Sequence, residues 1–131
     1  MVTGTFTNEM QQEGADLTRK LDGAGLNVRA ALWLFDPDAH LWRLLFGIDE
    51  VDRMGPRSVY KKVRSAILTD PTMSGKLDLR DVAVESPNNR LFQLLRSAIN
   101  TGPGVSGIRF ARNSINGTFI DDAFIYRLSQ S

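Results

Sequence analysis

The sequence feature that most constrains the fold is an imperfect internal repeat. The segment RSAILTDPTMSGKLDLR, residues 64–80, aligns without gaps on RSAINTGPGVSGIRFAR, residues 96–112, and nine of the 17 positions are identical. Each copy carries an apolar helical periodicity, a proline-containing turn, a Ser-Gly step and a strand-like run. Two consecutive helix–turn–strand units predict strand–helix–strand crossovers and therefore a packed sheet. The repeat can be explained by the similar packing of the two copies, so it does not require a functional site between them.

A β-hairpin is predicted at RAALWLFDPDAHLWRLLFGI, residues 29–48. Its turn reads Asp-Pro-Asp-Ala, residues 36–39, which is typical turn chemistry. Apolar residues stand at both odd and even positions of the flanking runs, as at Trp33 and Leu34. A strand with one face in water alternates apolar and polar residues, so these strands are predicted to be covered on both faces.

The remaining elements are predicted from periodicity and turn signals. A helix is expected from Asn8 to Leu21, but its apolar stripe is thin, and Gly14 weakens it by roughly 1 kcal/mol relative to alanine. We therefore expect this helix to pack outside the main core. The further predictions are helices at 56–68 and 87–99, a strand at 77–84, and a hairpin of strands 105–112 and 118–128 around an Asn-Gly turn.

These elements predict an α+β fold in a single domain over residues 1–131, with an N-terminal helical segment at 1–25 and a core at 26–131. The core is a five-stranded mixed β-sheet built from a β-hairpin, two consecutive helix–turn–strand crossover units and a C-terminal β-hairpin. Because parallel crossovers are right-handed, we expect both repeat helices on one face of the sheet. The other face then needs a cover, either the N-terminal helix or a second copy of the chain.

Composition excludes several classes of site. The 131 residues suffice to bury a core without metal or disulfide staples. The chain has no cysteine and one histidine, His40, which excludes disulfides, thiolate sites and multi-histidine zinc sites. The N-terminus has no signal-peptide pattern, and no apolar run approaches the roughly 20 residues needed to span a bilayer. We therefore expect a cytoplasmic protein with no membrane partner.

The basic residues are concentrated in two segments without acids, although the formal net charge is only +1. The segments are residues 53–68 and 86–120, and the first presents a helical stripe of cations. Such surfaces track phosphate backbones, although a solvated helix face explains them more often. The candidates for binding nucleic acid or another anion are Arg57, Lys61, Arg64, Arg109 and Arg112.

Two groups of residues could be interpreted as parts of an enzyme site. Residues 102–107 spell G-x-G-x-x-G, but they follow a predicted helix and precede a strand, the reverse of a dinucleotide-binding turn. Asp49, Glu50 and Asp52 follow the second strand, where a metal-dependent nuclease would need carboxylates, but their spacing fixes no pair on a common face. We assign no catalytic residue, no cofactor and no metal ligand.

A resemblance concerns element order. If the first hairpin counts as one elaborated strand, the predicted order over residues 41–128 is β-α-β-α-β-β. This order resembles that of the Alba proteins and of the C-terminal domain of bacterial initiation factor three. The resemblance implies nucleic-acid binding through basic surfaces and a C-terminal hairpin. It covers element order rather than a shared motif, and a fold does not by itself fix a function.

The leading expectation is a non-catalytic module that associates with itself, as a homo-oligomer, or with a partner protein. Its basis is that the two-sided apolar strands need more cover than the predicted helices supply. The interface candidates are Trp33, Phe35 and Trp42, because buried aromatic residues often anchor interfaces. A place in the core explains the same three residues equally well. A nucleic-acid-binding module is the alternative, and a metal-dependent nuclease is the third interpretation.

Overall fold

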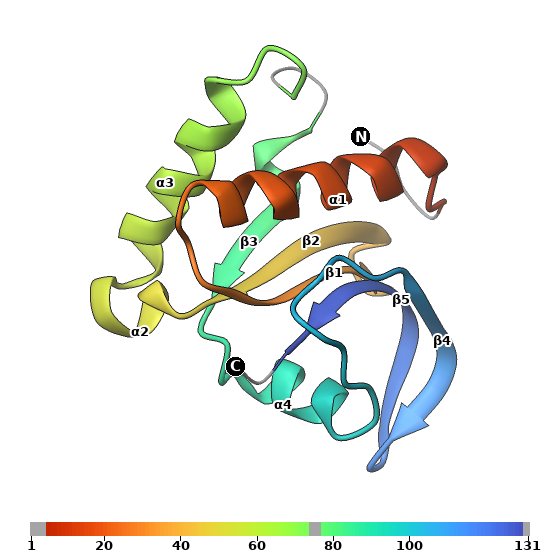
Figure 1. Ribbon diagram of the computed structural model, residues 1–131. Coiled ribbons are helices and arrows are strands. Elements are labelled where there is room, and N and C mark those ends of the chain that lie inside the picture. Colours follow the sequence, from red (N-terminus) through yellow and green to blue (C-terminus); the bar gives the residue numbers. More distant parts are fainter. Residues whose placement is uncertain (1–4, 74–76, 130–131) are drawn as a thin grey trace.

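The computed structural model describes residues 5–73 and 77–129, which form helices packed around one β-sheet (Figure 1). The helical segments in the described residues are α1 (Asn8–Gly23), α2 (Glu50–Met54), α3 (Pro56–Leu68), the short 3₁₀ helix η1 (Leu79–Asp81) and α4 (Arg90–Arg96). The strands are β1 (Val28–Asp36), β2 (Leu41–Ile48), β3 (Val82–Glu85), β4 (Ile108–Ile115) and β5 (Thr118–Leu128).

The five strands form one mixed sheet in the order β3-β2-β1-β5-β4. Strands β2 and β3 are parallel, and the other neighbouring pairs are antiparallel. Both predicted hairpins are present, β1 with β2 and β4 with β5, and the second turns at Asn116 and Gly117, which both have positive φ as a tight hairpin turn requires. The predicted α+β fold with a five-stranded mixed sheet, an N-terminal helix and a C-terminal hairpin is confirmed.

Alternate residues of the central strands belong to two separate apolar layers, one on each face of the sheet. Trp33, Phe46 and Tyr126 point into the layer beneath α1 and α3. Leu32 and Ile125 point into the other layer, which α4 covers. The two-sided apolar pattern thus arises because helices of the same chain cover both faces of the sheet.

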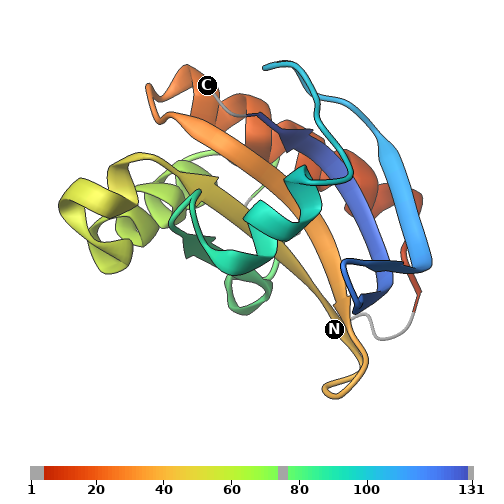
Figure 2. The ribbon, with the colours of Figure 1, turned by 90° about the horizontal axis from the view of Figure 1, so that it is seen from below.

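Helices α3 and α4 lie on opposite faces, so the prediction that both repeat helices share one face is wrong (Figure 2). The connection through α3 joins the adjacent parallel strands β2 and β3. The connection through α4 instead runs from β3 at one edge to β4 at the other. These two strands are antiparallel, so the handedness rule for parallel crossovers does not apply to α4.

The two repeat copies also differ in local structure. In the first copy, the residues predicted to begin a strand form η1, and β3 starts only at Val82. In the second copy the equivalent residues belong to β4, and only Arg96 of this copy is helical. Ser74 and Gly75, from the predicted turn of the first copy, lie outside the described residues.

Helix α1 packs directly on the main core, which corrects the expectation that it lies apart from it. Leu17 and Leu21 are fully buried, and the cap is Thr7 rather than Asn8, because the Thr7 hydroxyl accepts a hydrogen bond from the backbone N–H of Met10. A side chain on Gly14 would collide with the Tyr126 hydroxyl. The residue that weakens the isolated helix is the one that lets the helix reach the sheet.

Two hydrogen bonds complete the contact at Gly14. The Tyr126 hydroxyl donates to the backbone oxygen of Gln11 at 2.6 Å, and Trp33 Nε1 donates to the backbone oxygen of Met10 at 3.1 Å. A Cβ at position 14 would lie 2.6 Å from Trp33 Nε1. Both bonds therefore depend on the absence of a side chain at position 14.

Arg127, on β5, joins four segments of the chain from a buried position. Its side chain is 5% exposed and forms a two-pronged ion pair with Asp22 of α1, with N–O distances of 2.8 and 2.9 Å. It also donates to the backbone oxygens of Val28 and Gly104, both at 3.1 Å. The guanidinium thus holds the end of α1, the start of β1 and the 100–107 loop against β5.

Replacing Gly14 with alanine is expected to lower the free energy of unfolding by about 1–3 kcal/mol, the usual effect of overpacking a close contact. Helix propensity alone predicts a gain of about 1 kcal/mol, so the two effects have opposite signs. The measurement is urea unfolding followed by circular dichroism. The matched control is Gly23→Ala in the same helix, where nothing lies within 4 Å of an added methyl group, and it should hold or raise stability. Equal stability of Gly14→Ala and the parent would contradict the close packing.

Replacing Arg127 with methionine is expected to lower the free energy of unfolding by about 2–3 kcal/mol, because the buried carbonyl of Val28, the carbonyl of Gly104 and the carboxylate of Asp22 lose their donor. The measurement is again urea unfolding. Arg80→Met is the control, since Arg80 forms an ion pair with Asp78 on the surface, with its side chain 84% exposed, and its loss should leave the unfolding midpoint unchanged. Similar midpoints for the Arg127 and Arg80 variants would show that Arg127 does not hold the segments together.

Candidate functional site

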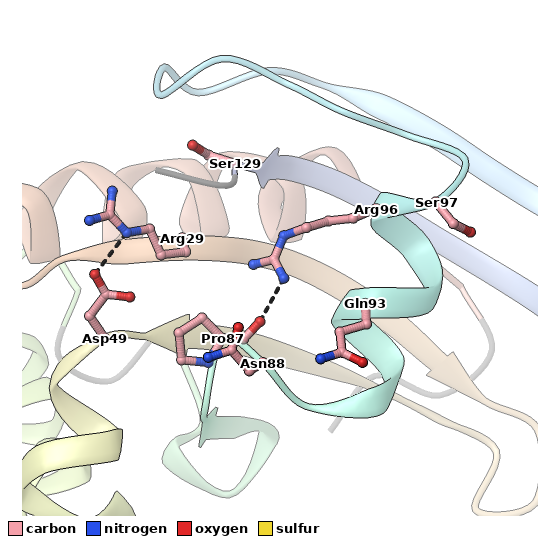
Figure 3. A pocket seen from close by; sticks show the side chains of 8 residues that line it. All are labelled: Arg29, Asp49, Pro87, Asn88, Gln93, Arg96, Ser97 and Ser129. Atoms are coloured by element: carbon pink, nitrogen blue, oxygen red, sulfur yellow. Dashed lines mark hydrogen bonds and ion pairs between the residues drawn. The ribbon is translucent and has the colours of Figure 1, made fainter.

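A polar pocket of about 420 Å³ lies between the start of β1, the end of β2 and α4 (Figure 3). Its volume falls within the range of small-molecule sites, roughly 300–1,000 Å³. The residues that line it are Arg29, Asp49, Pro87, Asn88, Gln93, Arg96, Ser97 and Ser129.

The floor of the pocket depends on a glycine in β2. A Cβ at Gly47 would lie 2.8 Å from the Phe92 ring and 3.0 Å from Pro87 Cα. Because position 47 carries no side chain, α4 and the segment before it can lie directly on the sheet. Asn89 caps α4 by accepting a hydrogen bond from the backbone N–H of Phe92 at 2.8 Å, and Phe92 and Leu95 are fully buried. These contacts fix the orientation of α4 and place Arg96 at the pocket wall.

Arg96 is the most unusual residue of the pocket. Its Nη1 donates to the Pro87 carbonyl at 2.6 Å. Its Nε is buried and has no hydrogen-bond partner, and no salt bridge to Arg96 exists among the described residues. Burial lowers the pKa of the Arg96 guanidinium below its ordinary value, and the charge of Asp49 partly opposes this shift. The fold therefore holds a cation whose donors are only partly satisfied, which is energetically costly.

Arg29 and Asp49 form the opposite wall as a direct pair. Arg29 Nε donates to Asp49 Oδ2 at 2.8 Å, and the two side chains are 31% and 40% exposed. The backbone oxygen of Arg29 accepts from the N–H of Ser129 at 2.8 Å, which attaches the end of β5 to this wall. Two guanidinium groups and one carboxylate leave the three charged side chains of the pocket with a formal sum of +1.

The predicted interface aromatics are mostly part of the core. Trp33 and Trp42 are each 2% exposed, and Phe35 is half-buried against Trp42, with the ring centroids 5.4 Å apart. Phe6 covers Trp42 on its other side. The two tryptophans are therefore not surface residues. The sequence analysis expected the N-terminal helix or a second copy of the chain to cover one face of the sheet, and in the described residues helices of the same chain cover both faces. Association with a partner stays a prediction, without these tryptophans as its contact surface.

The five predicted basic candidates do not form one surface. Arg57, Lys61 and Arg64 are exposed on the outer side of α3, which packs near β3 at one edge of the sheet. Arg109 and Arg112 lie on β4, the other edge.

The two arginines of β4 are also constrained by their surroundings. Arg109 forms a two-pronged ion pair with Asp122 at 2.6 Å and stacks over the rings of Phe6 and Trp42. Arg112 has a φ of 47° at an irregular point of β4, where the pairing with β5 is interrupted. Only the three residues of α3 remain as a coherent group of exposed cations.

Two of the three carboxylates considered for a nuclease, Asp49 and Glu50, already have partners, while Asp52 is exposed. Asp49 binds Arg29, and Glu50 accepts hydrogen bonds from the backbone and side-chain nitrogens of Asn27 at 3.0 and 2.7 Å. Burial acts to raise the pKa of Glu50, but the hydrogen bonds from Asn27 bring it below its ordinary value. Across residues 5–73 and 77–129, no three His, Asp or Glu side chains gather closely enough to hold a metal ion.

The sequence analysis did not identify this pocket. Arg96 counted only as one member of a basic segment, Arg29 only as part of a strand, and Asp49 only as a possible metal ligand. No local pattern links positions so far apart in the chain. The available signal was the charged residue Arg29 beside an otherwise apolar strand, which becomes informative only once the strand order is known.

No helix in the described part of the chain is long and apolar enough to cross a membrane. In comparisons with known proteins, no family model, no curated protein and no solved structure matches this chain.

Proposed function

We propose that this protein binds a small anionic ligand in the pocket between β1, β2 and α4, with Arg96 and Arg29 as the anion-binding residues. The observation that carries the proposal is the half-buried Arg96, whose Nε is buried without a hydrogen-bond partner and which has no carboxylate partner among the described residues. Arginine binds carboxylates and phosphates through strong charge-assisted hydrogen bonds. An anion bound in the pocket would supply the negative charge that Arg96 lacks as a direct partner.

The construction of the pocket supports binding rather than a surface ion pair. Arg96 is fixed by its bond to the Pro87 carbonyl and by the buried base of α4. Arg29 is fixed by Asp49 on the wall opposite Arg96 (Figure 3), and its two terminal nitrogens form no hydrogen bond with any described residue. Both cations are thus positioned before a ligand arrives, which reduces the ordering cost of binding.

The proposal is tested by titrating the protein with millimolar propionate, lactate, succinate and phosphate, while NMR follows the backbone amide signals of residues 86–97. We expect at least one anion to shift these signals saturably and to raise the melting temperature, because a ligand that binds only the folded state stabilises it. Arg96→Gln should lose this response. Arg19→Gln, which removes a surface arginine of α1 outside the pocket, should keep it. If none of the four anions shifts these signals in the parent protein, the proposal is wrong.

A second candidate function is nucleic-acid binding by the outer side of α3. The observation in its favour is that Arg57, Lys61 and Arg64 are exposed there and form no salt bridge with any described residue. Unpaired cations along one helix face are suited to contact successive phosphates.

This candidate is tested by fluorescence anisotropy with a labelled RNA and a labelled DNA duplex at several salt concentrations. If the three residues contact three phosphates, the logarithm of the association constant should fall with the logarithm of the salt concentration at a slope of about −2 to −3. The double variant Lys61→Glu/Arg64→Glu should abolish binding, and Arg19→Glu should weaken it only slightly. If both variants lost the same amount of affinity, binding would depend only on the overall charge of the protein. In that case α3 would not be the binding surface.

A further inference from the structure

Arg96 at one end of the pocket is not in direct contact with the Arg29–Asp49 pair at the other end. The negative charge of Asp49 acts on Arg96 and opposes the shift of its pKa, yet no salt bridge joins the two residues. Cavity space therefore separates a cationic wall at Arg96 from a carboxylate at the opposite wall (Figure 3).

The carboxylate of Asp49 retains acceptor capacity. Its Oδ2 accepts from Arg29 Nε at 2.8 Å, while its Oδ1 accepts no hydrogen bond from any described residue. An ionised carboxylate can accept several hydrogen bonds and has no proton to donate. A ligand group that lies beside Asp49 must therefore be a donor, because a second acceptor there would face an uncompensated negative charge.

The charge of the pocket limits the ligand further. Arg29, Arg96 and Asp49 sum to +1, so a ligand with one negative charge neutralises the site. A phosphate dianion would leave an excess of negative charge next to Asp49, and like charges at short range disfavour binding. The amide side chains of Asn88 and Gln93, which also line the cavity, can bind neutral polar groups of the ligand.

We infer that the ligand is a monocarboxylate with a hydroxyl group beside its carboxylate, held with the carboxylate on Arg96 and the hydroxyl donating to Asp49. This inference rests on the proposed anion-binding function and specifies its ligand class. The charge of Asp49 acts on Arg96 without a direct contact, so a carboxylate on Arg96 places its neighbouring carbon between Arg96 and Asp49. An α-hydroxycarboxylate has a donor at that carbon.

The experiment compares lactate, propionate and phosphate by NMR titration of the parent protein, Asp49→Asn and Asp52→Asn. Lactate and propionate differ only by the hydroxyl group, and a hydrogen bond to a charged acceptor corresponds to roughly tenfold in affinity. We expect lactate to bind the parent roughly tenfold more tightly than propionate, with phosphate weakest. Asp49→Asn should reduce the lactate preference and strengthen phosphate binding, because it removes the negative charge. Asp52→Asn, which changes an exposed carboxylate of α2 outside the pocket, should leave the order of affinities unchanged.

The possible failures are distinguishable. If phosphate binds the parent protein more tightly than lactate, or if lactate and propionate bind equally, the ligand class is wrong while anion binding stands. If none of these anions binds, the proposed function fails as well. The comparison of lactate with propionate on the parent protein needs no variant, so it decides the question even if Asp49→Asn does not fold.

Discussion

The buried guanidinium of Arg127 is the interaction on which the arrangement of the chain depends. It binds Asp22 at the end of α1, the Val28 carbonyl at the start of β1 and the Gly104 carbonyl in the loop before β4. A buried charge is stabilising only when its partners are complete, so these three segments must meet β5 together. Arg29 of β1 and Ser129, the residue after β5, line the candidate pocket. The structural ion pair and the proposed binding site thus share the same ends of the same strands.

Features of the fold that depend on local pattern could be predicted from the sequence. The Asn-Gly turn, the Asp-Pro-Asp-Ala turn and the two-sided apolar strands all correspond to observed elements. The face on which α4 lies could not be predicted, because it depends on β3 and β4 being at opposite edges of the sheet. Gly14 was taken as a weakness of α1 because propensity describes an isolated helix, whereas its contact with Tyr126 is formed only in the folded protein.

The candidate site, too, could not be predicted from local sequence patterns. Arg64 and Arg96 occupy equivalent positions of the repeat, yet Arg64 is exposed on α3 and Arg96 lines a pocket with a buried Nε. The three residues after each arginine are identical, so this local pattern does not reveal the difference, which comes from what lies against each helix. Likewise the sequence did not decide between an interface and the core for Trp33 and Trp42, which in the structure pack with Phe6 in the core.

The position of β5 between β1 and β4 also has a consequence for how the chain folds. Strand β1 completes its hydrogen bonding only with β5, and the bond from Tyr126 to Gln11 spans 115 residues. Contacts so distant in sequence slow folding, because a long loop must close before they contribute stability. During synthesis the β1–β2 hairpin emerges with the second edge of β1 unpaired, and this row of backbone groups gains its partner only when β5 follows. The nascent chain therefore carries its greatest aggregation risk in the interval between these two strands, when chaperone binding would matter most.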